Sequence, residues 1–290
     1  MAEFPQRVQV NEQNIEKVTT FYKRAYQEIV DEIQGATKFG KNNRRAILQQ
    51  VEKILTELGV DTQEFVKQEL PKYYETGADQ AVAQLKSINA NVLVSTGFNK
   101  VHKEAILAII DDSAKAIAES ISGVGRSASR LLNTAVKEEL KFRLAAGETS
   151  GEALEQTKKK IKGILQEEGL SALTDKSGRK WELDRYTEML IRTKGVEARN
   201  TGLVNRLVEN GYDLVQVSAH GATDTCGPWE GKILSATGKT KGYPTVDDAS
   251  SDSHLFGPNC RHAINVIVLD LAKETMGWNP ETQEYEKGLL

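Results

Sequence analysis

Cysteine and histidine, the side chains most used for metal binding and nucleophilic chemistry, are concentrated in one short part of this chain. The 290-residue sequence contains two cysteines and four histidines. Five of these six residues fall between positions 220 and 262, and they are His220, Cys226, His254, Cys260 and His262. Random placement would seldom produce such a cluster, so this Cys/His window is a candidate metal site or reactive centre.

Zinc is the metal that the window would suit. Zinc takes four nitrogen or sulfur ligands in a tetrahedron. The candidate ligands are Cys226, His254, Cys260 and His262. Residues two apart share one face of an extended segment, which predicts that Cys260 and His262 point the same way. Neither cysteine belongs to a Cys-x-x-Cys pair, so two alternatives stay open: two buried thiols acting as small hydrophobic groups, or two thiols that approach each other.

Catalytic motifs are not found in this sequence. It has no phosphate-binding loop, no His-Glu-x-x-His pair and no Gly-x-Ser-x-Gly elbow. Cys226 with His254 or His220 has the residue types of a nucleophile and its base, but no third element at a known spacing. We therefore assign no catalytic residues and expect no enzyme. The alternative is a metal-dependent hydrolase or injected toxin that uses the Cys/His window.

The elements before the window read as helices. Residues 72–227 contain no proline, and apolar residues recur at steps of three and four. The first such face consists of Ile15, Val18, Tyr22, Ala25, Tyr26, Ile29 and Ile33. We expect Asp61 and Thr62 to cap the start of a helix and Gly123-Val124-Gly125 to break one.

The carboxyl-terminal part has a different pattern. Residues 200–290 hold ten of the 23 glycines, which indicates many turns. Short runs of branched residues at 214–217, 232–234 and 263–269 predict a two- or three-stranded sheet under the last long helix.

The predicted fold class is therefore mainly α with a small α+β carboxyl-terminal module. An elongated helical part comes first, and a compact, turn-rich lobe follows. The expected domains are a helical arm at 1–170, the module at 171–275 and a tail at 276–290.

Charge and hydropathy narrow the function classes. The net charge is -3, from 38 basic and 41 acidic residues. This excludes a nucleic-acid-binding protein that is highly basic over its whole length. Residues 126–199 carry a net charge of +4, and the candidate DNA-binding residues there are Arg126, Arg130, Lys137, Lys141, Lys158, Lys159 and Lys160. The alternative is a solvated helix face, because aromatic residues for base stacking are scarce. No apolar run is long enough for a membrane-spanning segment.

Several short motifs, in order, resemble those of tailed-phage minor capsid and head morphogenesis proteins. They are DKSGRKWELDRYTEMLIRT from Asp175, VSAHGA from Val217, CGPWEGKILS from Cys226 and GPNCRH from Gly257. The family is phage minor capsid protein 2, related to the Mu F-like group, and the resemblance covers residues 170–270. Its interaction or structural positions here are Arg179, Trp181, Arg192, Thr193, His220, Trp229, Gly231, Asn259 and Arg261.

The resemblance implies a protein of the virion, in the head interior or near the portal, that is made in the host bacterial cytoplasm. It implies action in head assembly and in DNA packaging or ejection. The implied partners are the portal protein and the major capsid protein of the same phage, with non-specific DNA as a further partner. The resemblance implies no catalytic residues. Many Mu F-like relatives have a Cys-x-x-Cys pair and a His-Pro-Asn-Cys-Arg segment, where this chain has Trp229 and Gly257. Zinc as a cofactor therefore rests on the Cys/His window alone.

Overall fold

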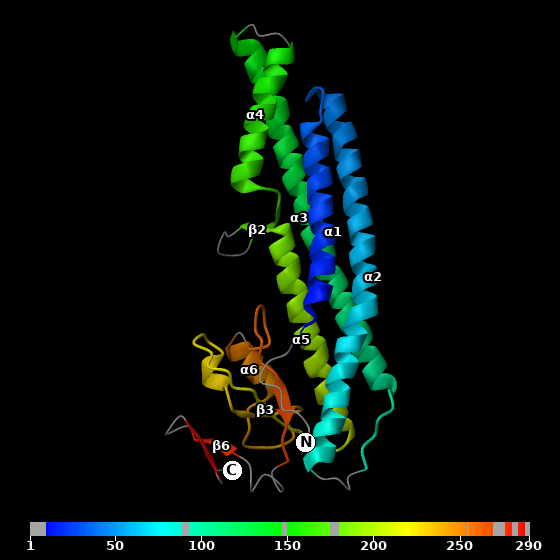
Figure 1. Cartoon of the computed structure of the whole chain (residues 1–290), viewed down its shortest axis with the longest axis vertical. Coiled ribbons are helices and arrows are strands. Elements are labelled where there is room, and N and C mark those ends of the chain that lie inside the picture. The colour runs from blue at the N-terminus through cyan, green and yellow to red at the C-terminus, as the bar shows by residue number, and fades with distance from the viewer. Residues whose placement is uncertain are drawn as a thin grey trace. The chain divides into compact units, whose positions relative to one another are not determined.

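The computed structural model in Figure 1 is mainly helical, as the sequence predicts. It describes residues 10–88, 93–146, 150–174, 180–253, 255–268, 276–279 and 284–287. The long helices are α1 (Glu12–Gln34), α2 (Lys41–Ile88), α3 (Lys100–Ala146), α4 (Ser150–Glu168) and α5 (Leu183–Glu209). A 3₁₀ turn, η1 (Gly227–Trp229), and a short helix, α6 (Val246–Asp252), follow them. None of the helices in the described ranges is long and apolar enough to cross a membrane.

The strands form three small antiparallel sheets within the described residues. One hairpin joins β1 (Ser171–Thr174) to β2 (Lys180–Glu182), and another joins β6 (Met276–Asn279) to β7 (Glu284–Lys287). The third sheet has the order β4-β3-β5, with β3 (Leu214–Val217) between β4 (Ile233–Ser235) and β5 (Ile264–Val266). This is the predicted carboxyl-terminal sheet, although β5 is shorter than the run 263–269 that predicted it.

The chain divides into two compact units, and neither is a single stretch of sequence. Unit 1 contains Met1–Asn11, Lys67–Asp111 and Leu190–Leu290. Unit 2 contains Glu12–Val66 and Asp112–Met189. Helices α2, α3 and α5 therefore each contribute residues to both units. The division into arm, module and tail stays a prediction.

Unit 2 is built on the apolar helix faces that the sequence indicates. The residues of α1 that are buried are Ile15, Val18, Tyr22, Ala25, Ile29, Val30 and Ile33. On α2 the buried residues of this unit include Ile47, Val51, Leu55 and Leu58. The three- and four-residue spacing thus identifies the correct face, because only one side of each helix meets its neighbours.

Two predicted helix boundaries are wrong. Helix α3 continues through Gly123-Val124-Gly125, since Val124 is fully buried and a Cβ at Gly125 would lie 3.3 Å from Leu55. Tertiary packing there outweighs the cost of about 1 kcal/mol for each glycine in a helix. Asp61 and Thr62 lie inside α2, where the Thr62 hydroxyl donates to the Leu58 carbonyl at 2.8 Å instead of capping a helix start.

In unit 1, two glycines allow the backbones of α2 and α5 to contact each other. A Cβ added at Gly77 would lie 1.8 Å from the Arg199 carbonyl oxygen. A Cβ added at Gly202 would lie 2.0 Å from the Tyr74 carbonyl oxygen. Because 77 meets 199 and 202 meets 74, the two helices cross antiparallel, and any side chain larger than hydrogen would push them apart.

Arg206 of α5 holds the segment 93–99 in place within unit 1. Its guanidinium, only 1% exposed, donates to the carbonyl oxygens of Ser95, Thr96 and Gly97 at 2.8–3.2 Å. It also contacts the Glu209 carboxylate at 2.6 Å. A guanidinium suits this site because its several donors lie in one plane and can reach neighbouring carbonyl groups and a carboxylate together.

The three-stranded sheet packs on α2 and α5 within unit 1, as expected for a sheet under the last long helix. Its core joins Ala81 and Leu85 of α2 to Leu203 and Leu207 of α5 and to apolar residues of β3, β4 and β5. The buried side chain of Gln84 donates to Asn265 Oδ1 and accepts from the Val266 backbone N–H, both at 2.8 Å. This amide therefore links α2 directly to β5.

Asp213, just before β3, anchors the loop that follows β4. Its carboxylate accepts from the Ser235 hydroxyl at 2.5 Å, and it accepts from both the backbone N–H and the hydroxyl of Thr237 and of Thr240 at 2.6–3.1 Å. Burial alone would raise the pKa of Asp213, but these hydrogen bonds hold it well below the ordinary value.

Replacing Asp213 with asparagine is expected to lower the free energy of unfolding by about 2 kcal/mol at pH 7, because an amide nitrogen cannot accept hydrogen bonds. A depressed pKa in the folded state stabilises the protein above the unfolded pKa of about 3.9, and this contribution is lost as the pH falls below it. Urea unfolding of Asp213→Asn at several pH values should show the deficit shrinking in acid. Exposed Asp79→Asn is the control, and an equal deficit in both variants would contradict the assignment.

Candidate functional site

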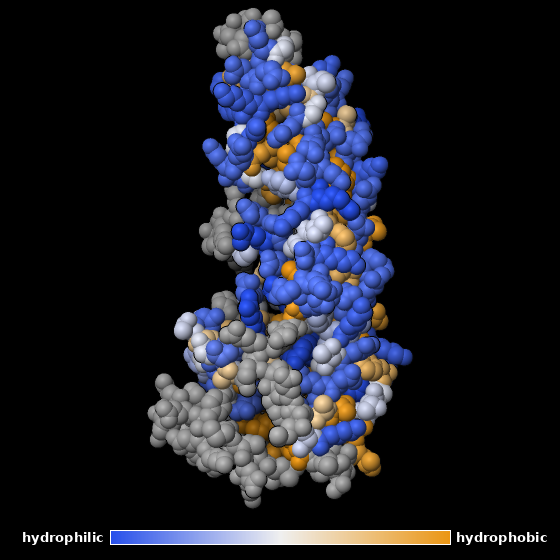
Figure 2. Space-filling view, viewed as in Figure 1, coloured by the Kyte–Doolittle hydropathy of each residue, from blue (hydrophilic) through white to orange (hydrophobic). Residues whose placement is uncertain are grey.

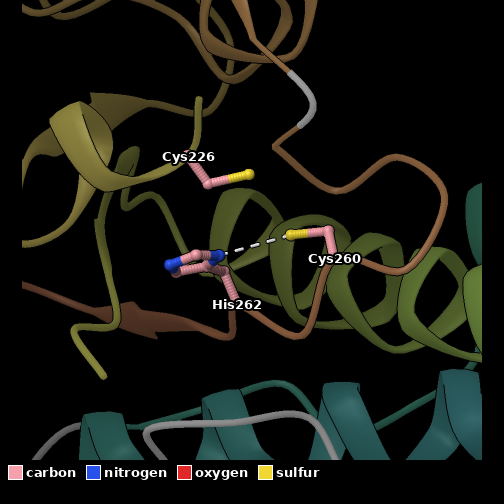
Figure 3. A group of neighbouring side chains, drawn as sticks. All are labelled: Cys226, Cys260 and His262. Atoms are coloured by element: carbon pink, nitrogen blue, oxygen red, sulfur yellow. Dashed lines mark hydrogen bonds between the residues drawn. The ribbon is translucent and has the colours of Figure 1, made fainter. Parts of the chain in front are cut away.

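Both cysteines and one histidine of the Cys/His window come together in unit 1. Figure 3 shows the two sulfur atoms and the imidazole of His262 turned toward one another. One ligand atom from each residue lies within 4.8 Å of the other two. Cys260 Sγ lies 3.3 Å from His262 Nδ1. Cys226 and His262 are each 2% exposed, so this cluster, Cys226–Cys260–His262, is largely shielded from solvent.

Cys226 is placed by the turn that leads into η1. Its backbone N–H donates to the Asp224 carboxylate at 2.9 Å, and its carbonyl accepts from the Trp229 N–H at 2.9 Å. Gly227 allows a tight approach here, because a Cβ would lie 2.5 Å from the Ala222 carbonyl oxygen. The turn thereby directs the thiol inward.

Cys260 and His262 are placed by the chain entering β5. Phe256 and Asn259 both have positive φ, at 63° and 65°, which bends the loop so that the Cys260 N–H reaches the Gly257 carbonyl at 3.1 Å. Beyond the loop, Ala263 pairs with Ser218 through two hydrogen bonds of 2.9 Å. The side chains at 260 and 262 meet as their two-residue spacing predicts.

Glu230, at the end of η1, holds the other side of the His262 ring. Its carboxylate lies 3.0 Å from His262 Nε2. The same carboxylate accepts the backbone N–H groups of His220, Gly221 and Ala222 at 2.9–3.1 Å. Since ionised carboxylates only accept, we assign the His262 proton to Nε2. The lone pair of Nδ1 then faces the two thiols.

His220 lies beside this arrangement. Its ring stacks on the His262 ring, with centroids 4.2 Å apart and planes inclined by 28°. Its Nδ1 is 3.7 Å from the Glu230 carboxylate, so His220, Glu230 and His262 form a second group of potential ligands. The Glu230 oxygens, however, already accept three backbone donors and one ring nitrogen.

The electrostatics of the cluster couple its members. Burial and the nearby Cys260 raise the pKa of Cys226 to about 12. Burial opposes ionisation of Cys260 too, but its hydrogen bond with His262 lowers the pKa below the ordinary value. Burial disfavours the His262 cation, yet Cys260 and Glu230 together raise the pKa of His262. The Cys260 thiolate and the His262 imidazolium, which carries a second proton on Nδ1, therefore stabilise each other.

The arrangement offers two soft sulfur atoms and one imidazole nitrogen, which is the donor set of a zinc site. It also contains the residue types of a cysteine nucleophile with a histidine base oriented by a carboxylate. Within the described residues, the second thiol favours a metal site, because a single nucleophile would make no use of it.

The other residues that the sequence predicts to belong to a metal site or a family motif lie on several different elements. His254 and Arg179 lie outside the described residues. Trp181 is in β2, in unit 2, and its ring packs edge-on against Tyr186 with centroids 6.4 Å apart. Arg192 and Thr193 are partly buried on α5.

Four further motif residues lie in the Cys/His window, two of them with structural roles and two at the surface. Trp229 is 8% exposed in the core of unit 1, with Lys232 Nζ 4.5 Å above its ring. Gly231 has a positive φ of 74°, which favours glycine. Asn259 and Arg261 are exposed at the loop surface.

The basic residues predicted to contact DNA are on α3 and α4 of unit 2. All of them are exposed except Lys158, which is partly buried. Positions 126, 130, 137 and 141 follow spacings of four, seven and four, which places them on one face of α3. Lys160 contacts Glu138 at 2.7 Å, and this hydrogen bond lowers the pKa of Glu138.

Sequence reasoning missed Glu230. The window contains several acidic residues, and spacing alone gives no reason to choose one of them. The signal that identifies Glu230 is the turn of η1, which returns the chain toward residues 220–222 and places the carboxylate on their N–H groups.

Comparison with known proteins gives two matches. The family model described as Phage minor capsid protein 2 matches residues 25–286. A protein described as "Structural protein" of Lactococcus phage LL-H is 28% identical over 106 residues. That alignment covers 34% of this chain and 29% of the relative, so the chain matches less than a third of the relative's length. No solved structure matches significantly.

Proposed function

The chain belongs to the phage minor capsid protein 2 family, and we propose that it acts at the portal, in the head interior, to support head assembly and DNA packaging or ejection. A minor capsid protein is a structural component of the phage particle. The observation that carries the proposal is the extent of the family match, which runs from residue 25 to 286 and so includes residues of both units. The proposed partners are the portal protein and the major capsid protein of the same phage.

The long helices supply surface for such partners. Helix α2 has 48 residues and α3 has 47, and both carry large apolar side chains that face solvent. In unit 2 these are Val60, Leu140 and Leu144, which are 57–77% exposed. Figure 2 shows apolar side chains interspersed with hydrophilic ones on the visible helices. Mixed surfaces of this kind are usual where proteins associate without being permanently joined.

The portal proposal is tested by assembling procapsids with and without the portal. The untagged chain is coexpressed with the major capsid, scaffolding and portal proteins of its phage, and purified particles are analysed by quantitative mass spectrometry. We expect the chain to be present in few copies per particle and to be lost when the portal gene is omitted. Absence from portal-containing particles would refute incorporation into the head. Equal amounts with and without the portal would refute portal binding in favour of the shell.

Contact with DNA is proposed as part of packaging or ejection, since four basic residues share one face of α3. Binding through phosphates would weaken steeply with salt, and the slope would report the number of contacts. Lys137→Glu with Lys141→Glu should reduce that slope by about 2, at roughly one unit for each contact. If the salt dependence of binding were the same in this variant and in the original chain, this face of α3 would not contact DNA.

A further inference from the structure

The cluster Cys226–Cys260–His262 has the geometry of a transition-metal site before any metal is added. Zinc bonds of about 2.3 Å to sulfur and 2.0 Å to nitrogen place tetrahedral ligand atoms about 3.5–3.8 Å apart. Here the three ligand atoms lie within 4.8 Å of one another, and the Cys260–His262 pair is already at 3.3 Å. Small side-chain movements would therefore bring all three to bonding distance of one ion.

Glu230 gives the second, independent observation. Histidines that bind metals almost always donate their other ring N–H to a carboxylate or carbonyl, which fixes the ring and makes the ligating nitrogen more basic. Glu230 holds His262 Nε2 at 3.0 Å, and three backbone N–H groups hold Glu230 in turn. The ring is thus fixed with Nδ1 toward the sulfurs.

The second potential group, His220–Glu230–His262, is the weaker candidate. A carboxylate has about four lone-pair sites. In Glu230 the three backbone donors and His262 account for these sites, which leaves no lone pair for a metal. Sulfur ligands favour zinc over magnesium or calcium, so the cluster with the two thiols is the stronger candidate.

We propose that Cys226 Sγ, Cys260 Sγ and His262 Nδ1 bind one Zn²⁺, with water as the fourth ligand and with Glu230 orienting the imidazole through Nε2. The metal would join the turn at 226–230 to the loop at 256–262, two segments that lead into β4 and β5 at the end of the sheet where β3 finishes. Its role is to stabilise this part of unit 1. Both thiols would bind as thiolates, and their protons would pass to solvent when the ion enters.

The test begins with the native chain, so that it does not depend on any variant folding. Untagged full-length protein is purified from zinc-supplemented cells under reducing conditions, and metals are measured by mass spectrometry. We expect one zinc per chain, removal by a chelator together with a lower melting temperature, and recovery of both on adding zinc. Replacement by cobalt should give the thiolate-to-metal absorption of a tetrahedral sulfur site.

Two histidine variants give a matched comparison. His262→Gln should abolish stoichiometric zinc and the cobalt absorption. His102→Gln is the control, since His102 is also a buried histidine of unit 1 that pairs with a carboxylate, Glu209, and it should retain zinc. Glu230→Gln should weaken zinc affinity about 10- to 100-fold while leaving the stoichiometry intact.

Three results would overturn the proposal. The first is native protein that takes up no zinc from a metal buffer. The second is zinc that persists in the double variant Cys226→Ser, Cys260→Ser. The third is a Cys226–Cys260 disulfide in protein that is purified without reductant, a disulfide that chelators do not affect. This result would make the pair a redox element instead of a metal site.

Discussion

Gly77→Ala is expected to destabilise unit 1 by about 3 kcal/mol, at the upper end of the usual range for an overpacked contact. The added methyl group would occupy space 1.8 Å from the Arg199 carbonyl oxygen, which is backbone and cannot rotate away. Gly202→Ala should act similarly against Tyr74. Urea unfolding followed by circular dichroism measures both effects.

The two glycine variants also test the crossing itself. Each substitution separates the same pair of helices, so the second should cost less once the first is present, and the double variant should be less than additive. Gly163→Ala in α4 is the control, because nothing lies within 4 Å of its Cβ position, and it should stabilise by about 0.5–1 kcal/mol. Near-wild-type stability of Gly77→Ala would mean that the helices do not approach as described.

Arg206→Met is expected to reduce the free energy of unfolding by about 3–5 kcal/mol, as for other buried charges whose partners are left behind. The methionine can fill the space but donates nothing to the carbonyl groups of Ser95, Thr96 and Gly97. Thermal unfolding measures the loss. Hydrogen exchange should show that the amides of residues 93–102 lose protection first.

Two further substitutions separate charge from geometry. Arg206→Lys keeps the positive charge but lacks the planar fork, so its loss should fall between those of wild type and Arg206→Met. Arg185 lies on the same helix, but both it and its partner Glu182 are exposed. Arg185→Met should therefore lower the free energy of unfolding by less than about 1 kcal/mol. If Arg206→Met and Arg185→Met lowered the free energy of unfolding equally, Arg206 would not hold the segment 93–99 in place.

The fold class could be predicted from the sequence because helices and strands bury one face with different periods. Strand β3 coincides with the run 214–217, and α1 buries the face that its apolar spacing indicates. The break predicted at Gly123-Val124-Gly125 is wrong because contacts between distant segments decide whether a glycine ends a helix. The residues around Gly125 in the sequence do not indicate that Leu55 lies beside it. The hairpins β1–β2 and β6–β7 were not predicted either, since their short strands lack a clear alternation.

The candidate site was partly predictable for a similar reason. Residue type and clustering identify Cys226, Cys260 and His262, and the two-residue spacing of the last two predicts their contact. Selecting Glu230 from the acidic residues of the window requires the path of the chain through η1. Whether His254 belongs to the site stays a prediction, because it lies outside the described residues.

The hydrogen bonds from Gln84 to Asn265 and Val266 join residues that are about 180 positions apart. During translation the amino-terminal partner therefore emerges long before the strand that completes its surroundings. Unit 1 can close only after the ribosome has made the chain as far as β5, so a product that ends before β5 lacks the strand that completes this core. Incomplete chains would expose apolar surface and be removed by chaperones and proteases before they could enter a growing particle.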